Sequence, residues 1–293
     1  MLDLMLTPLA AALIILAMNA YFGLHIIRRG VIFVDLAFAQ IAALGATAGM
    51  LLGADHGSAA SVLWAFGFTL LGALLFSFTR MERSLVPQEA IIGIAYVVAS
   101  AAVILLSSFT AEGAEHIKET LTGSLIWVTW PAVGKVALPY ALIALFHYAF
   151  RKQMLGITFH PERASRVRLW DFIFYVTFGV AVSLVVDLAG VLLIFSTLVI
   201  PATIAFLYVD SFRPALLIAW ATGTLAIVGG LLSSFHWDVT TGPLLVVSFG
   251  VVLVLAAALR SAIGLRGTVA PVRSAAGETP AEVANVGGPA TGP

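Results

Sequence analysis

Two acidic side chains lie in apolar stretches of the chain, where a charge is costly, and they are the first candidates for chemistry. Asp35 lies five residues before Gln40, and Asp187 closes another apolar run. An ionised acid in such a stretch faces a bundle interior, a cation path or a basic partner. Asp35 therefore lines a path or pairs with Arg28 or Arg29. Asp187 lines the mouth of a path or caps the following helix.

The spacing of Asp35 and Gln40 limits what they can bind together. On a helix they lie about 140° apart, so one ion does not reach both side chains easily. An amide oxygen is also a poorer ligand for zinc-like ions than an imidazole nitrogen. Asp35 and Gln40 are therefore only weak metal-binding candidates, and no metal-ligand set is assigned.

A third polar group surrounds the proline of the most apolar stretch. Pro201 frees the carbonyl near Thr197, and the hydroxyls of Ser196, Thr197 and Thr203 can bond to it. Broken helices with polar neighbours commonly line membrane pathways. Ser196, Thr197 and Pro201 are therefore pathway candidates, with a kinked packing helix as the equal alternative.

Enzymatic motifs are missing from the whole sequence. There is no cysteine, no Gly-x4-Gly-Lys-Ser/Thr, no Gly-x-Ser-x-Gly and no His-Glu-x-x-His. The net charge is zero, which argues against a nucleic-acid partner. We expect no catalytic residue and no tightly bound cofactor, and any ATP that drives this protein must bind another polypeptide.

The composition shows which elements position these residues. The 293 residues are 61% hydrophobic and 10% charged, which is typical of an all-α, polytopic membrane bundle. The count is nine, or eight if the helices around Asp187 are continuous. The expected spans of about 20 residues are Leu6–Ile27, Val31–Leu52, Ala59–Phe78, Glu89–Ser108, Pro131–Phe150, Leu169–Val186, Gly190–Tyr208, Pro214–Ser234 and Pro243–Leu259.

Basic residues predict the orientation. Thirteen of the fifteen lie on one side of these spans, and only Lys118 and Lys135 lie on the other. The positive-inside rule then places the N-terminus outside and the C-terminus in the cytoplasm, in the inner (plasma) membrane. We expect a transmembrane domain over residues 1–265 and a disordered, Gly-, Pro- and Ala-rich cytoplasmic tail over 266–293.

Five segments in order resemble one transporter family. The run GVLLIFSTLVIPATIAFL at 190–207 resembles the permeases of ABC transporters that import zinc, manganese or iron. The other similar segments are the second span around Gly45, the Gln-Glu-Ala-Ile-Ile-Gly run ending at Gly93, the His-Pro-Glu-Arg-Ala run ending at Ala164, and Asp238 to Pro243. The second span departs from the family's Asp and His four residues apart, because Leu36 and Gln40 stand there.

The resemblance implies partners and a mechanism. It implies a homodimer of permeases, cytoplasmic ATP-binding-cassette ATPases and an extracytoplasmic metal-binding protein, with a divalent metal ion as substrate. Which ion is carried is left open. An inner-loop helix would couple the ATPase to the path, and a Pro at the first helical position starts a helix well. Its residues here are Phe159, His160, Pro161, Glu162, Arg163 and Ala164.

Two other functional classes stay open at this point. A stand-alone, ion-coupled secondary transporter or channel would use Asp35, Glu89 or Asp187 as a proton or cation site. Such carriers are commonly built from repeats, and the two halves of this chain show no clear repeat. An intramembrane enzyme is the weakest alternative, because the chain lacks nucleophile and metal motifs.

Overall fold

The computed structural model describes residues 2–55, 58–79, 86–109, 123 and 125–264. Within these residues the chain forms α-helices joined by short connections, with two single 3-10 turns and no strand. The fold is therefore all-α, as predicted. The predicted tail, residues 266–293, lies outside the described residues.

Nine of the described helices are long and apolar enough to cross a membrane, which confirms the count of nine. The helices that carry them are α1 (Leu2–Arg29), α2 (Val34–Leu51), α3 (Ala59–Thr79), α4 (Gln88–Ser107), α6 (Trp130–Ala149), α8 (Val167–Ala189), α9 (Val191–Tyr208), α10 (Phe212–Trp237) and α11 (Thr241–Ala262). Their bounds lie close to the predicted ones because an apolar run of this length has few other stable environments.

The break between α8 and α9 decides between eight spans and nine. Helix α8 ends at Ala189, and α9 begins at Val191. Gly190 between them has φ +75°, a left-handed backbone value that glycine adopts without a steric cost. The two helices are therefore separate spans that meet in a tight turn.

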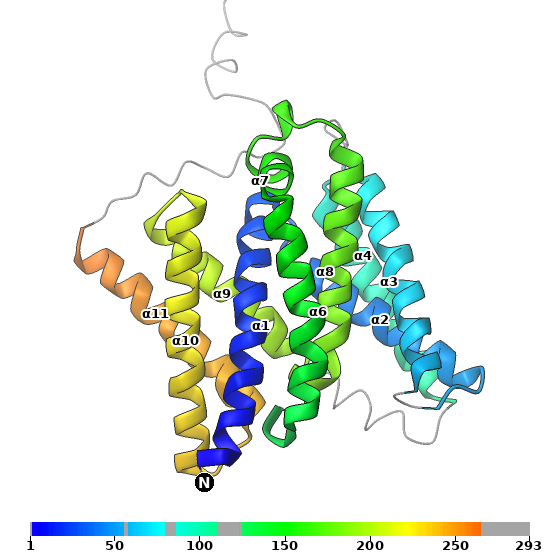
Figure 1. Cartoon of the computed structure of the whole chain (residues 1–293), viewed down its shortest axis with the longest axis horizontal. Helices are drawn as coiled ribbons and strands as arrows, with labels where there is room; N and C mark the ends of the chain where they lie inside the picture. The colour runs from blue at the N-terminus through cyan, green and yellow to red at the C-terminus, as the bar shows by residue number, and fades with distance from the viewer. Residues whose placement is uncertain (1, 56–57, 80–85, 110–122, 124, 265–293) are drawn as a thin grey trace, which may run out of the picture.

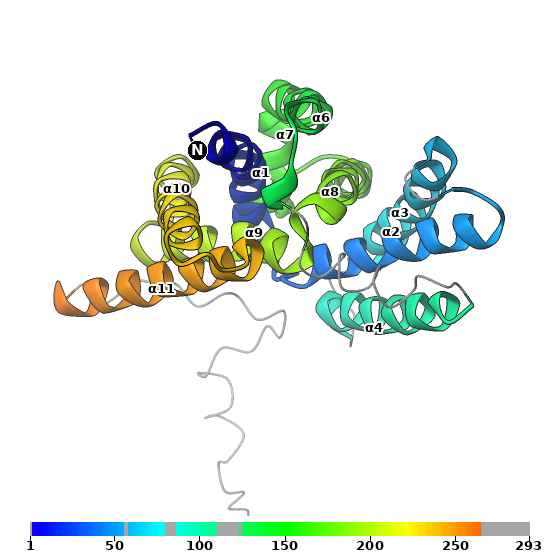
Figure 2. The ribbon, with the colours of Figure 1, turned by 90° about the horizontal axis from the view of Figure 1, so that it is seen from below.

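The helices form two groups (Figures 1 and 2). Helix α1 packs against α9, α10 and α6, and α9 also packs against α10 and α11. On the other side, α2 packs against α3 and α4, and α3 packs against α8. Figure 2 shows α4 and α11 at opposite ends of one face, with α9 and the start of α2 between them.

The connection between α6 and α8 is more structured than the sequence predicted. A short helix, α7 (Arg151–Phe159), follows α6 and was not predicted, because nine residues are too few for an apolar span. The predicted helix start at Pro161 is present with proline at the first position, but it is a single 3-10 turn, η2 (Pro161–Arg163). Figure 1 places α7 at the opposite end of the bundle from the N-terminus.

Candidate functional site

Asp35 lies in the first turn of α2 and is buried, with 1% of its surface exposed. In the part of the chain that the structure describes, neither of its carboxylate oxygens has a hydrogen-bond partner. Arg28 contacts Asp210 at 3.3 Å, and Arg29 contacts Asp171 at 3.0 Å. The predicted alternative that Asp35 pairs with Arg28 or Arg29 is therefore wrong.

Glu89 is the acidic neighbour of Asp35, and it comes from the first turn of α4. Its Oε1 accepts a hydrogen bond from the amide of Phe33 at 3.1 Å, just ahead of α2. Its Oε2 is buried without a hydrogen-bond partner among the described residues. Glu89 thus fixes the start of α2 through the Phe33 amide. Asp35 and Glu89 have no basic partner among the residues that the structure describes.

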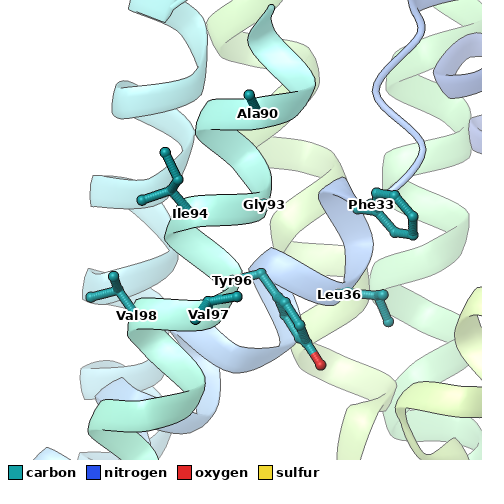
Figure 3. A pocket seen from close by; sticks show the side chains of 8 residues that line it. All are labelled: Phe33, Leu36, Ala90, Gly93, Ile94, Tyr96, Val97 and Val98. Atoms are coloured by element: carbon teal, nitrogen blue, oxygen red, sulfur yellow. The ribbon is translucent and has the colours of Figure 1, made fainter.

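The other face of α2 borders an apolar groove shared with α4 (Figure 3). The groove has a volume of about 580 Å³, and Phe33, Leu36 and Tyr96 point into it together. Gln40 follows Leu36 by one turn, so it lies on the same face and is half-buried. Asp35 is turned into the protein instead. The structure therefore does not bring Asp35 and Gln40 together.

Asp187 lies at the far end of the bundle from Asp35, in the last turn of α8, and is exposed. The N-cap position of α9 is Gly190, and the alternative that Asp187 caps α9 stays a prediction. Asp187 borders a cavity of about 70 Å³ with Ala42, Ser61 and Ser183. This places it at the opening between α2, α3 and α8.

Ser196, Thr197 and Pro201 are buried in a continuous helix, so the predicted break in α9 is wrong. The two hydroxyls donate to the carbonyls of Leu192 and Ile194, at 2.8 and 2.9 Å. Each hydroxyl has one proton, so neither bonds the carbonyl that Pro201 frees.

The same face of α9 is packed tightly against α1. The amide of Asn19 donates to the Thr197 hydroxyl at 2.9 Å. A Cβ added at Gly23 would lie 1.9 Å from the carbonyl oxygen of Leu198. The backbones of α1 and α9 are therefore in contact one turn before Pro201. This contact favours the packing role for Ser196, Thr197 and Pro201.

The sequence reasoning missed a buried polar cluster at the end of α1. Arg29 pairs with Asp171 of α8 and donates through Nε to the Thr158 hydroxyl at 3.1 Å. Nδ1 of His25 lies 2.7 Å from the same hydroxyl, and Arg29 sits 3.8 Å over the ring of Phe174. Opposite charges near the same membrane surface, Arg29 ending one span and Asp171 opening another, were the signal that could have found it.

The six predicted coupling residues lie next to this cluster, and three of them, His160, Glu162 and Arg163, are exposed. Phe159 ends α7 and packs against the rings of His25 and Phe212. Glu162 lies 3.8 Å from His160 and 3.9 Å from Arg163, and all three side chains are more than half exposed. Pro161 and Ala164 flank them on η2 and are half-buried.

The described residues contain no group of three or more His, Asp or Glu side chains that could hold a metal ion. Around α2, the side chains with possible metal-binding oxygens are Asp35, Glu89 and Gln40, and they form no such group. A resident metal centre of the structural type therefore has no ligand set here.

Comparisons with known proteins identify the family. The model of the ABC 3 transport family matches residues 1–260. The manganese import system permease protein ScaB of Streptococcus gordonii is 24% identical, over 84% of this chain and 88% of its own length. The chelated iron transport system membrane protein YfeD of Yersinia pestis is 28% identical, over 57% of each chain.

A solved structure has the same fold. PsaBC from Streptococcus pneumoniae, in complex with Fab, gives a TM-score of 0.70 at 22% identity, over 85% of this chain and 89% of that chain. Nine spans and a family match over nearly the whole described chain agree with the resemblance seen in the sequence. The chain is a multi-pass inner-membrane permease that belongs to the ABC 3 transport family.

Proposed function

We propose that this chain is the membrane subunit of an ATP-binding-cassette importer that moves a divalent transition-metal ion into the cytoplasm. Manganese, iron and zinc are the ions concerned, and a separate ATPase subunit supplies the energy. The single observation that carries this proposal is the family match over residues 1–260. The missing phosphate-binding loop supports the need for a second polypeptide.

The orientation follows from an odd number of spans and from the arginines. Nine spans in the described residues put the two ends of the bundle's chain on opposite sides. The cluster at Arg28 and Arg29 lies at the same end as α7 with Arg151 and Lys152. The positive-inside rule makes this end cytoplasmic, so an ATPase would meet α7 and η2.

The ion path is proposed along the α2–α4 groove, with a second copy of the chain covering it. Phe33 is 47% exposed there and stacks on Phe195 of α9, with ring centroids 6.3 Å apart. Leu36 and Gln40 face this side, at the positions where the family's metal ligands stand. Asp35 lies buried behind the groove, and its carboxyl group would favour a cation there in its ionised form.

Asp187 is proposed at the outer mouth of the path. It is exposed at the end that the orientation makes extracytoplasmic, where a metal-binding protein would deliver the ion. An exposed carboxylate attracts a cation weakly and releases it readily. Ser196, Thr197 and Pro201 are given a packing role instead, because α1 covers their face of α9.

The proposal is tested by co-expressing the chain with a candidate ATP-binding-cassette ATPase from the same organism and purifying through a tag on the permease. We expect a stable complex whose ATP hydrolysis rises when the metal-loaded binding protein is added. Elemental analysis of that binding protein identifies the ion. A permease that purifies alone under these conditions, with no change in hydrolysis, would refute the proposal.

A further inference from the structure

We infer that a pocket between α7, η2 and the start of α8 receives an acidic side chain of the ATPase subunit. This inference rests on the proposed function. The pocket holds about 260 Å³ and is lined by Lys152, Gly156, Ile157, His160, Arg163 and Trp170, among others. It opens at the end of the bundle that the arginines make cytoplasmic, beside the predicted coupling residues.

The rim of the pocket is basic. Lys152, His160 and Arg163 border it, and Arg163 has 82% of its side chain exposed. The one acid close by, Glu162, lies 3.9 Å from Arg163, is itself 62% exposed and does not line the pocket. Glu162 also lies 3.8 Å from His160, but both contacts are solvated, and one carboxylate beside Lys152 and Arg163 leaves a net positive rim that is complementary to a further carboxylate.

The floor of the pocket is apolar, and there is open space above it. Ile157 is fully buried and Trp170 is half-buried, so the exposed part of Trp170 offers contact area to methylene groups. A Cβ added at Gly156 meets nothing within 4 Å, which means that open space lies directly over the backbone of α7. A glutamate fits this shape, because its stem can cover the floor while its carboxylate reaches the rim.

The wall of the pocket is connected to the membrane-spanning helix α1 by polar contacts. Thr158 follows Ile157 on α7, and its hydroxyl contacts both His25 and Arg29 of α1. Arg29 in turn pairs with Asp171, and both side chains are almost completely buried. A displacement of α7 is therefore transmitted to α1 and α8 through these short polar contacts. A side chain bound in the pocket would in this way shift the membrane spans.

Lys152 makes the pocket directly testable. The chain has three lysines, and Lys118 and Lys135 fall on the opposite side of the membrane in the proposed orientation. A carbodiimide joins an amine to a carboxylate that touches it. Applied to inside-out vesicles that contain the full permease and its ATPase, it should link Lys152 to one Asp or Glu of the ATPase, identified by peptide mass spectrometry.

Four variants separate charge from shape. Lys152→Arg keeps the charge and removes the amine, so the link should disappear while assembly is kept. Lys152→Glu should weaken co-purification of the ATPase about tenfold. Gly156→Leu fills the pocket without a clash and should do the same. Gly134→Leu is the matched control, because Gly134 also has open space around it but lies near the other end of the bundle.

The outcomes are distinct. A link from Lys152 to the ATPase that Gly156→Leu abolishes supports the inference. An assembled complex in which Lys152 links only to its own chain or to a second copy overturns it, as does full assembly of both Lys152→Glu and Gly156→Leu. A wild-type chain that binds no ATPase would refute the proposed function, and the inference with it.

Discussion

The α1–α9 side of the bundle and the α2–α4 side differ in how their buried acidic side chains are paired. On the α1 side, Asn19 is bonded to Thr197, and Arg29 is paired with Asp171. On the α2 side, Asp35 is equally buried, yet its carboxylate oxygens have no hydrogen-bond partner in the described part of the chain. The second side also holds the large groove at Phe33 and Leu36.

This contrast separates structural polar groups from functional ones. A buried pair with matched hydrogen bonds fixes helices in place and needs no ligand. A buried acid without a basic partner is costly in a membrane, and such residues are usually kept for a role in transport. We therefore interpret the α1 side as the structural frame, and we propose that the α2–α4 side carries the ion path.

The largest expected effect comes from breaking the frame at its buried charge pair. Asp171→Asn leaves Arg29 without its counter-charge, and this should lower the free energy of unfolding by about 3–5 kcal/mol. The control is Asp210→Asn, since the Arg28–Asp210 pair is 33% and 60% exposed and should cost at most about 1 kcal/mol. Thermal unfolding in detergent measures both, and equal losses would contradict the distinction.

The next effect comes from the close approach of α1 and α9. Gly23→Ala places a methyl group against the Leu198 carbonyl, so the helices must move apart, at about 1–3 kcal/mol. Gly134→Ala, in open space on α6, should be neutral or slightly stabilising. The same melting assay decides, and an unchanged Gly23→Ala protein would show that the two backbones do not touch.

On the α2 side a substitution should spare stability and reduce transport. Asp35→Asn removes a buried acid that has no hydrogen-bond partner among the described residues and keeps the shape, so folded yield should be unchanged or higher. Uptake per folded molecule should fall about tenfold. Normal uptake would remove Asp35 from any electrostatic role, and a loss of yield like that of Asp171→Asn would place it in the frame instead.

The frame was largely predictable from the sequence because hydropathy reports burial directly. The spans and the break near Asp187 follow from apolar runs and from Gly190. Helix α7 was missed because it is short and half polar, so no apolar period marks it. The span of α9 was predicted, but the choice between a packing helix and a pathway helix stayed open, because it depends on how α1 packs against this segment.

The candidate site was harder to predict because it depends on which face of α2 points inward. Asp35 and Leu36 are adjacent, and composition does not say which one borders the groove. The answer comes from α4, since Glu89 fixes the start of α2 through the Phe33 amide. Such a contact joins residues 56 positions apart and leaves no mark on local sequence patterns.

The smallest effect tests the groove face itself. The double variant Leu36→Asp with Gln40→His places an acid and an imidazole four residues apart on that face, as in the family's pattern. We expect increased retention of zinc or manganese by the purified protein, because imidazole binds these ions better than an amide does. The control is Asp35→His, on the buried face, which should retain no additional metal.

The most direct test of the account is uptake of isotopic manganese, iron or zinc by proteoliposomes that contain this chain, its ATPase and the binding protein. The account predicts uptake of at least one ion that requires both ATP and the ATPase and that falls in the Asp35→Asn variant. Uptake by the chain alone, driven by an ion gradient and indifferent to ATP, would contradict it.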